Sequence, residues 1–123
     1  MDKKYTVYLS DRLLHNYNKE YRHSVKEWGL DHADKHFSKV DEFISSLEYM
    51  GSSFSGVGKN KEYRINQITS GLKMLYHTDE NNKKVSVIDI AGKHRYRELE
   101  QKAKTRKTKP RADHRLTAPA DEK

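Results

Sequence analysis

The chain carries the runs Glu62-Tyr-Arg-Ile-Asn-Gln-Ile68, Leu72-Lys-Met-Leu-Tyr76 and Val85-Ser-Val-Ile-Asp-Ile-Ala-Gly-Lys-His-Arg-Tyr-Arg97. Apolar and polar side chains alternate along these runs, which is the pattern of a half-buried β-strand. Thr69-Ser-Gly71 makes a tight connection after the first run, and a polar loop at 79–84 follows the second. The sequence therefore predicts strands at about 61–68, 71–78 and 84–91, paired as two antiparallel hairpins.

A further strand and two helices are predicted before these runs. Alternation over 4–10 indicates the strand, and Ser10 or Asp11 can cap a helix that Gly29 ends. Asp31 can cap a second helix. Apolar residues recur at spacings of three and four in both helices, namely Leu14, Tyr17, Tyr21, Val25 and Trp28 in the first and Ala33, Phe37, Val40, Ile44 and Leu47 in the second.

These elements predict an α+β fold: a strand, a two-helix hairpin, a three-stranded antiparallel sheet and a short C-terminal helix that begins near Arg97. We expect one face of the sheet to pack against the helices through Tyr63, Ile65, Leu72, Met74 and Tyr76. Arg64, Asn66 and Lys73 would then share the other face. An exposed sheet edge near 5–9 or at 85–91 could accept a strand from a partner.

The composition limits the kind of protein. With 123 residues, 33% of them hydrophobic, and a mean hydropathy of −1.12, the chain can form one small domain. Because it has no cysteine, disulfides, thiolate catalysis and cysteine zinc sites are excluded. Its sequence has no apolar run long enough to cross a membrane and no signal-peptide pattern, so we expect a soluble cytoplasmic protein.

Positive charge is concentrated near the end of the chain. Residues 93–111 contain nine Lys or Arg against two Glu, a net charge of +7, which equals the net charge of the whole chain. Such a segment favours polyanions through counterion release. We expect a domain over 1–103 and a basic, disordered tail over 104–123, which could instead serve solubility alone.

The order of these elements and the run Val87-Ile-Asp-Ile-Ala-Gly-Lys-His-Arg95 resemble the RelE/ParE superfamily of bacterial type II toxins over about residues 4–103. The resemblance implies a compact toxin that either cuts mRNA, usually on the ribosome, or poisons DNA gyrase. It also implies an antitoxin partner that covers the basic face with an acidic or amphipathic segment.

The RelE-like branch of this resemblance implies a set of catalytic residues. Arg64 and Lys73 keep a basic residue at two strand positions, whereas Asn66 stands where many of these nucleases have a second Lys. His94 stands where some have Arg and others a catalytic His, and Tyr96 lies near the expected tyrosine. The nucleic-acid contacts would come from Asn66, Lys93, Arg95, Arg97, Lys104, Arg106 and Lys107.

The implied reaction is attack of a ribose 2′-hydroxyl on the adjacent phosphate. His94 can act as acid or base near neutral pH, and Arg64 and Lys73 would hold the phosphate, with Arg95 a possible third cation. Tyr96 could stack on a base or assist proton transfer. No cofactor or metal is expected; His32 and His36 are four apart on a helix, yet Asp31 and Asp34 do not complete a metal site.

Three functions remain open on the sequence. The first is a metal-independent endoribonuclease that cleaves mRNA, with His94 essential. The second is a ParE-like gyrase inhibitor, in which His94 is dispensable. The third is a non-catalytic RNA- or ribosome-binding module on the same fold, which Asn66 favours.

Overall fold

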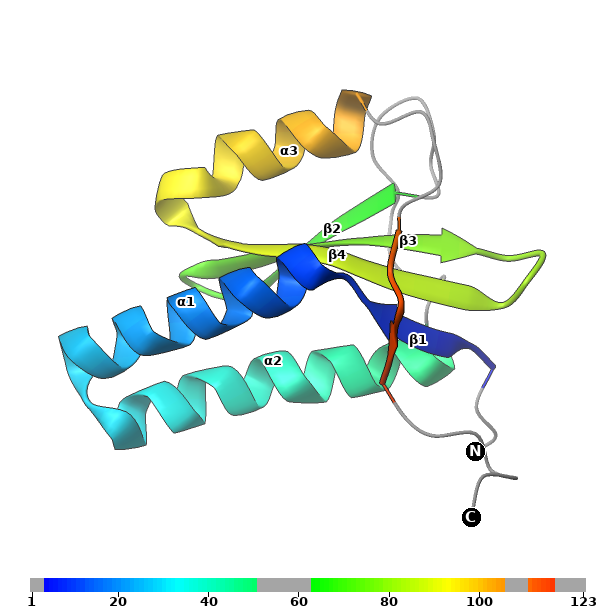
Figure 1. Cartoon of the computed structure of the whole chain (residues 1–123). Coiled ribbons are helices and arrows are strands. Elements are labelled where there is room, and N and C mark those ends of the chain that lie inside the picture. Colours follow the sequence, from blue (N-terminus) through cyan, green and yellow to red (C-terminus); the bar gives the residue numbers. More distant parts are fainter. Residues whose placement is uncertain (1–3, 51–62, 106–110, 117–123) are drawn as a thin grey trace, which may run out of the picture.

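The computed structural model describes residues 4–50, 63–105 and 111–116. Its elements follow in the order β1 (Thr6–Leu9), α1 (Asp11–Trp28), α2 (Leu30–Met50), β2 (Tyr63–Thr69), β3 (Leu72–Asp79), β4 (Lys84–Gly92), the 3-10 turn η1 (Lys93–Arg95), α3 (Tyr96–Thr105) and β5 (His114–Arg115). The predicted α+β fold, with its helical hairpin, three later strands and C-terminal helix, is confirmed (Figure 1). The stretch Gly51-Ser-Ser-Phe-Ser-Gly-Val-Gly58, whose glycines and serines predict a loop, lies outside the described residues.

The strands form one sheet in the order β2-β3-β4-β1-β5. β2, β3 and β4 pair as the predicted antiparallel hairpins, and β1 joins β4 in parallel. α1 and α2 cover one face of the sheet, and α3 lies on the other face (Figure 1). β1 pairs with Lys84–Val87 of β4. The edge predicted to be exposed at 85–91 is therefore covered by a strand over 85–87.

Two apolar clusters, one on each face, hold the layers together. The larger joins Leu13 of α1 and Phe37 and Val40 of α2 to the sheet, and the smaller places Leu99 and Ala103 of α3 against Tyr63 and other strand residues. Burial of these apolar surfaces is the main source of stability for such a small domain. No described helix is long and apolar enough to cross a membrane.

The register of β2 corrects the predicted division of the sheet faces. Tyr63 and Ile65 pack in the α3 cluster, whereas Met74 and Tyr76 pack in the α1–α2 cluster. Cross-strand partners share a face, and Arg64 pairs with Tyr76 as Asn66 pairs with Met74. Arg64 and Asn66 therefore lie on the α1–α2 face and Lys73 on the α3 face, because alternation within each strand does not fix the register between strands.

A β-bulge in β4 places a charged residue inside the molecule. Leu75 of β3 pairs with Asp89, but the next residue, Tyr76, pairs with Val87, so Ile88 is an extra residue. Bulges of this kind bend a strand and redirect its side chains. Ile88 packs with Leu75 on the α3 face, and the carboxylate of Asp89 is completely buried there.

The ends of α1 agree with the predicted capping. Ser10 accepts a hydrogen bond from the backbone N–H of Leu13 at 2.9 Å and donates one to the carbonyl of Ile88 at 2.6 Å. Gly29 has φ = +90°, a conformation that favours glycine, and its N–H bonds to the carbonyl of Val25. α2 begins at Leu30, so Asp31 lies in its first turn rather than before it.

Part of the segment predicted as a tail belongs to the sheet. β5 pairs with β1, the N–H of Leu116 donates to the carbonyl of Val7 at 2.9 Å, and Ala112 is buried. Leu116 also packs against the larger cluster. The edge of β1, which was predicted to be exposed, is thus covered by a later segment of the same chain. Burial of the apolar residues Ala112 and Leu116 stabilises the docking of this segment.

Candidate nucleic-acid interface

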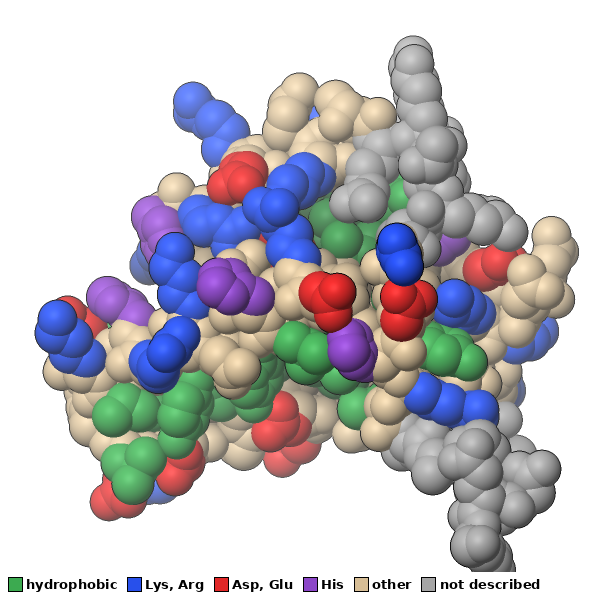
Figure 2. Space-filling model, viewed as in Figure 1, with side chains coloured by type: hydrophobic (Ala, Val, Ile, Leu, Met, Phe, Trp, Pro, Cys, Tyr) green, Lys and Arg blue, Asp and Glu red, His purple; other side chains and the backbone are tan. Residues whose placement is uncertain are grey.

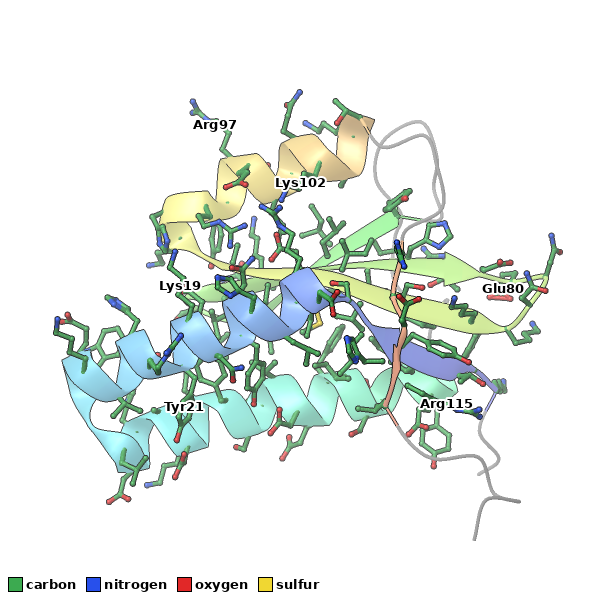
Figure 3. The ribbon with its side chains drawn as sticks, viewed as in Figure 1. Lys19, Tyr21, Glu80, Arg97, Lys102 and Arg115 are labelled. Atoms are coloured by element: carbon green, nitrogen blue, oxygen red, sulfur yellow. The ribbon has the colours of Figure 1, made fainter. Side chains whose placement is uncertain are left out.

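Lysine and arginine side chains gather over α3 and between α3 and α1 (Figure 2). α1 contributes Arg12 and Lys19, and the η1–α3 segment contributes exposed Lys93, Arg97 and Lys104. Lys19 and Lys102 extend into the space between the two helices, whereas Arg97 points outward from α3 (Figure 3). This surface, the α1–α3 basic surface, contains several of the residues that the sequence assigned to nucleic-acid binding.

The buried carboxylate of Asp89 forms ion pairs with three basic side chains of α1, η1 and α3. Its Oδ2 lies 3.1 Å from Arg12 Nε, 2.9 Å from Arg95 Nη2 and 3.4 Å from Lys102 Nζ. Its Oδ1 accepts hydrogen bonds from Asn16 at 2.7 Å and from the N–H of Ile90 at 2.8 Å. The buried carboxylate is therefore fully paired, as a charge in a protein interior must be.

Arg95 is oriented inward by these contacts. It also donates to the carbonyl of Ile90 at 3.2 Å and to Glu98 at 3.1 Å, and its side chain is 16% exposed. Burial disfavours the charged form, but the hydrogen bonds and charges of Glu98 and Asp89 outweigh it and raise the pKa of Arg95. These contacts hold η1 against β4 and the first turn of α3. The contact of Arg95 with phosphate stays a prediction.

His94 lies in η1, two residues after the end of β4, beside a carboxylate that the sequence did not single out. The His94 side chain is 64% exposed, and its Nε2 lies 4.0 Å from Oε2 of Glu20, whose side chain is 9% exposed. A Cβ added at Gly92 would lie 2.8 Å from Glu20 Oε1 and 3.3 Å from the His94 ring. Glycine at position 92 therefore allows α1, β4 and the imidazole to approach one another.

Lys73 and Tyr96 form a second group on the α3 face. Lys73 Nζ lies 4.6 Å from the centre of the Tyr96 ring and 3.1 Å from Glu100 Oε1. Burial raises the pKa of the Tyr96 hydroxyl, against a smaller opposite effect of Lys73. The buried hydroxyl oxygen of Tyr96 has no hydrogen-bond partner among the described residues.

Arg64 and Asn66 are separated from both groups. Arg64 Nε lies 3.4 Å from Thr78 Oγ1 and Asn66 Nδ2 lies 3.3 Å from the Tyr76 hydroxyl, on the α1–α2 face. The structure thus brings Lys73 and Tyr96 together, places His94 beside Glu20, and leaves Arg64 and Asn66 on the opposite face of the sheet from Lys73. Arg106 and Lys107 lie outside the described residues.

Solved structures identify this architecture. A chain of the chromosomal ParDE toxin–antitoxin system from P. aeruginosa matches with a TM-score of 0.61 and 13% identity, covering 72% of this chain and 96% of its own. A chain of the RelBE2 toxin–antitoxin complex from Mycobacterium tuberculosis matches with a TM-score of 0.54 and 14% identity, covering 73% and 99% respectively. The chain has the RelE/ParE fold. By contrast, neither a protein-family profile nor a curated protein sequence matches it.

On this RelE/ParE fold, several contributors to the interface were missed by the sequence analysis. The polar side of α1 contributes Arg12, Asn16 and Glu20. Helical spacing alone predicts that side chains on this side of the helix face solvent. Asp89 did carry a signal, because a carboxylate inside the apolar run Val87-Ile-Asp-Ile90 must find partners when the strand is buried. Within the described part of the chain, no three His, Asp or Glu side chains are grouped as metal ligands.

Proposed function

We propose that this protein is the toxin of a type II toxin–antitoxin pair and that it cleaves RNA without a metal ion. The observation that carries the proposal is the position of His94, exposed in a basic turn and next to the largely buried carboxylate of Glu20. The RelE/ParE fold supports the toxin assignment. An accessible imidazole flanked by cations is suited to proton transfer next to a phosphate.

In the proposed reaction, His94 removes the proton of a ribose 2′-hydroxyl as the 2′-oxygen bonds to the adjacent phosphorus. The bond from phosphorus to the 5′-oxygen breaks, and that oxygen takes a proton from water at this open site. Cleavage leaves a 2′,3′-cyclic phosphate and a 5′-hydroxyl. Exposed Lys93 and Arg97, with Lys73 nearby in the fold, would attract the phosphate charge.

The decisive experiment compares wild type with His94→Ala, both in purified cleavage assays and by mapping mRNA 5′ ends in cells. We expect cleavage that falls about 100-fold or more in His94→Ala, because general acid–base catalysis contributes about 10²–10⁴-fold. His15→Ala, which removes an exposed histidine of α1, is the matched control. Equal cleavage by wild type and His94→Ala would contradict the role of His94.

The predicted catalytic residues lie on two different faces of the sheet, which favours one alternative function, a ParE-like inhibitor of DNA gyrase. Arg64 and Asn66 lie across the sheet from Lys73, and Arg95 is bound to Asp89. A binding protein does not need these groups in one cleft. Arrested supercoiling with intact mRNA would support this alternative, and salt-sensitive RNA binding with neither effect would leave a binding module on the ribosome or another RNA.

An antitoxin partner is part of the proposal. The α1–α3 basic surface suits a segment rich in Asp and Glu, which would neutralise it and block access to His94. Replacing Lys93 and Arg97 by Glu should then weaken antitoxin binding and RNA binding together. Loss of RNA binding with unchanged antitoxin affinity would place the antitoxin elsewhere.

A further inference from the structure

Four aromatic rings form a row at the tip of the α1–α2 hairpin. The ring centre of Trp28 lies 6.4 Å from that of His23 and 5.4 Å from that of His32, and His32 stacks on His36 with centres 6.0 Å apart and planes 17° apart. We call these residues the ring row. Each contact lies within the distance range of aromatic pairs.

Three of the four rings in the ring row are exposed, and His36 is partly buried. Trp28 is 61% exposed, and His23 and His32 are also exposed. The indole of Trp28 is therefore accessible to an aromatic group of a partner, on which it could stack. Leu30, at 58% exposed, is the neighbouring apolar side chain.

Basic residues border the ring row on both helices. Lys19, His23 and Lys26 follow one another at spacings of four and three along α1, which places them on one side of that helix. Lys39 acts electrostatically on His36, whose pKa is lowered mainly by burial and further by His32 and Lys39. Rings between cations are the arrangement with which proteins bind single-stranded nucleic acid.

The ring row ends close to the end of the sheet that carries His94. His36 Nε2 lies 3.2 Å from Oγ1 of Thr69, at the turn between β2 and β3. Leu72, just after that turn, pairs with Gly92, two residues before His94. A strand of RNA lying on the ring row could therefore continue toward His94 without crossing the molecule.

We propose that the ring row binds single-stranded RNA by stacking bases on Trp28 and the neighbouring imidazoles. This inference deepens the proposed function and rests on RNA being the target. It assigns the hairpin tip to holding unpaired nucleotides beside the cleavage position. Stacking is tolerant of sequence because every base has an aromatic face, so the ring row would contribute affinity rather than sequence choice.

Trp28 is the chain's single tryptophan, so its fluorescence reports on the ring row alone. The test titrates full-length His94→Ala with an eight-nucleotide oligouridylate and follows Trp28 fluorescence together with the anisotropy of a labelled copy of the same RNA. We expect saturable quenching and binding with one dissociation constant. His32→Ala should raise that constant about tenfold, because each stacked base contributes roughly 1–3 kcal/mol.

Leu30→Ala is the matched control, since it removes an exposed apolar side chain at the same tip without removing a ring. Unchanged affinity in Leu30→Ala with weakened affinity in His32→Ala and Trp28→Ala supports the inference. RNA binding without quenching, and with normal affinity in Trp28→Ala, would overturn it while leaving the proposed function intact. If the protein binds no RNA, both this inference and the proposed function are wrong. If Leu30→Ala and Trp28→Ala both abolish self-association and leave RNA affinity unchanged, the hairpin tip is a protein interface and the inference is wrong.

Discussion

Asp89 shows how one residue organises the candidate interface. Its carboxylate is inaccessible to solvent, yet it is reached by Arg12 of α1, Arg95 of η1 and Lys102 of α3. The three cations come from segments far apart in the sequence, so the carboxylate links α1 to the chain that carries His94. A buried charge of this kind costs solvation free energy, which its three cationic partners offset.

Replacing Asp89 by Asn should destabilise the protein by about 2–4 kcal/mol, because three partly buried cations lose their counter-charge while the shape is kept. Denaturant unfolding measures the loss. Asp113→Asn, which affects an exposed pair with Arg111, serves as the control and should change stability by less than about 0.5 kcal/mol. Equal stability of the two variants would show that Asp89 does not carry the proposed link.

Under the proposed role of His94, Gly92→Ala should impair RNA cleavage more than folding. The backbone at Gly92 has φ = −75° and ψ = 175°, which alanine adopts freely, but the added Cβ would press on Glu20 and the His94 ring. We expect a 10–100-fold lower kcat from the displaced imidazole, with a stability loss below about 1 kcal/mol.

Gly71→Ala is the comparison for this substitution, since a Cβ there meets no other atom within 4 Å. Its kcat should match that of the wild type. If both alanine variants retain full activity, the close approach at Gly92 is not needed for catalysis.

At the scale of elements, the helical hairpin and the sheet are joined at a few points outside the apolar clusters. Ser10 is one, because its hydroxyl caps α1 and at the same time bonds to β4 at Ile88. The bulge that follows Val87 turns Ile88 and Asp89 toward α3. The start of α1 and the bulge of β4 therefore depend on each other.

Ser10→Ala should reduce the free energy of unfolding by about 1–2 kcal/mol, since it removes an N-cap and leaves a carbonyl of the sheet without its donor. Thermal or denaturant unfolding provides the measurement. Ser38→Ala removes an exposed hydroxyl that bonds within α2 and should change little. A loss confined to Ser38→Ala, with Ser10→Ala unchanged, would contradict the linking role of Ser10.

At the scale of the whole molecule, the chain closes its own sheet edge. β5 lies beside β1, and Leu116 borders a cavity of about 200 Å³ together with Leu9, Leu13, Leu14, Tyr17, Asp41, Ile44 and Ser45. Covering an edge in this way prevents unwanted strand pairing. The basic C-terminal segment thus contributes to folding as well as to charge.

Leu116→Ala should lower the free energy of unfolding by about 1–2 kcal/mol, because the substitution removes the apolar contacts between the Leu116 side chain and the larger cluster. Hydrogen exchange at the Leu116 amide, which bonds to Val7, should become faster. Arg115→Ala, at an exposed position of β5, controls for the strand itself. Slower or unchanged exchange in Leu116→Ala would argue that pairing with β1, rather than this side chain, holds the segment.

Local patterns in the sequence predict the order and nature of the main elements. Alternation over the three later strands, the apolar spacing of the helices, Ser10 and Gly29 as helix ends, and the turn at 69–71 are local signals that neighbouring residues produce together. The same local signals placed His94 at the end of β4 in a basic segment. These short-range patterns were sufficient to predict the α+β fold, which the structure confirms.

Which side chains meet depends on contacts between distant parts of the chain. The register between β2 and β3 set Arg64 and Asn66 apart from Lys73, the bulge turned Asp89 inward, and the polar side of α1 delivered Glu20 to His94. Each of these depends on contacts between residues distant in the chain, and a shift of one residue in strand register exchanges the two faces of a sheet. Periodicity within a strand or helix carries no information about that register, so the fold was predictable from the sequence while the arrangement of the candidate site was not.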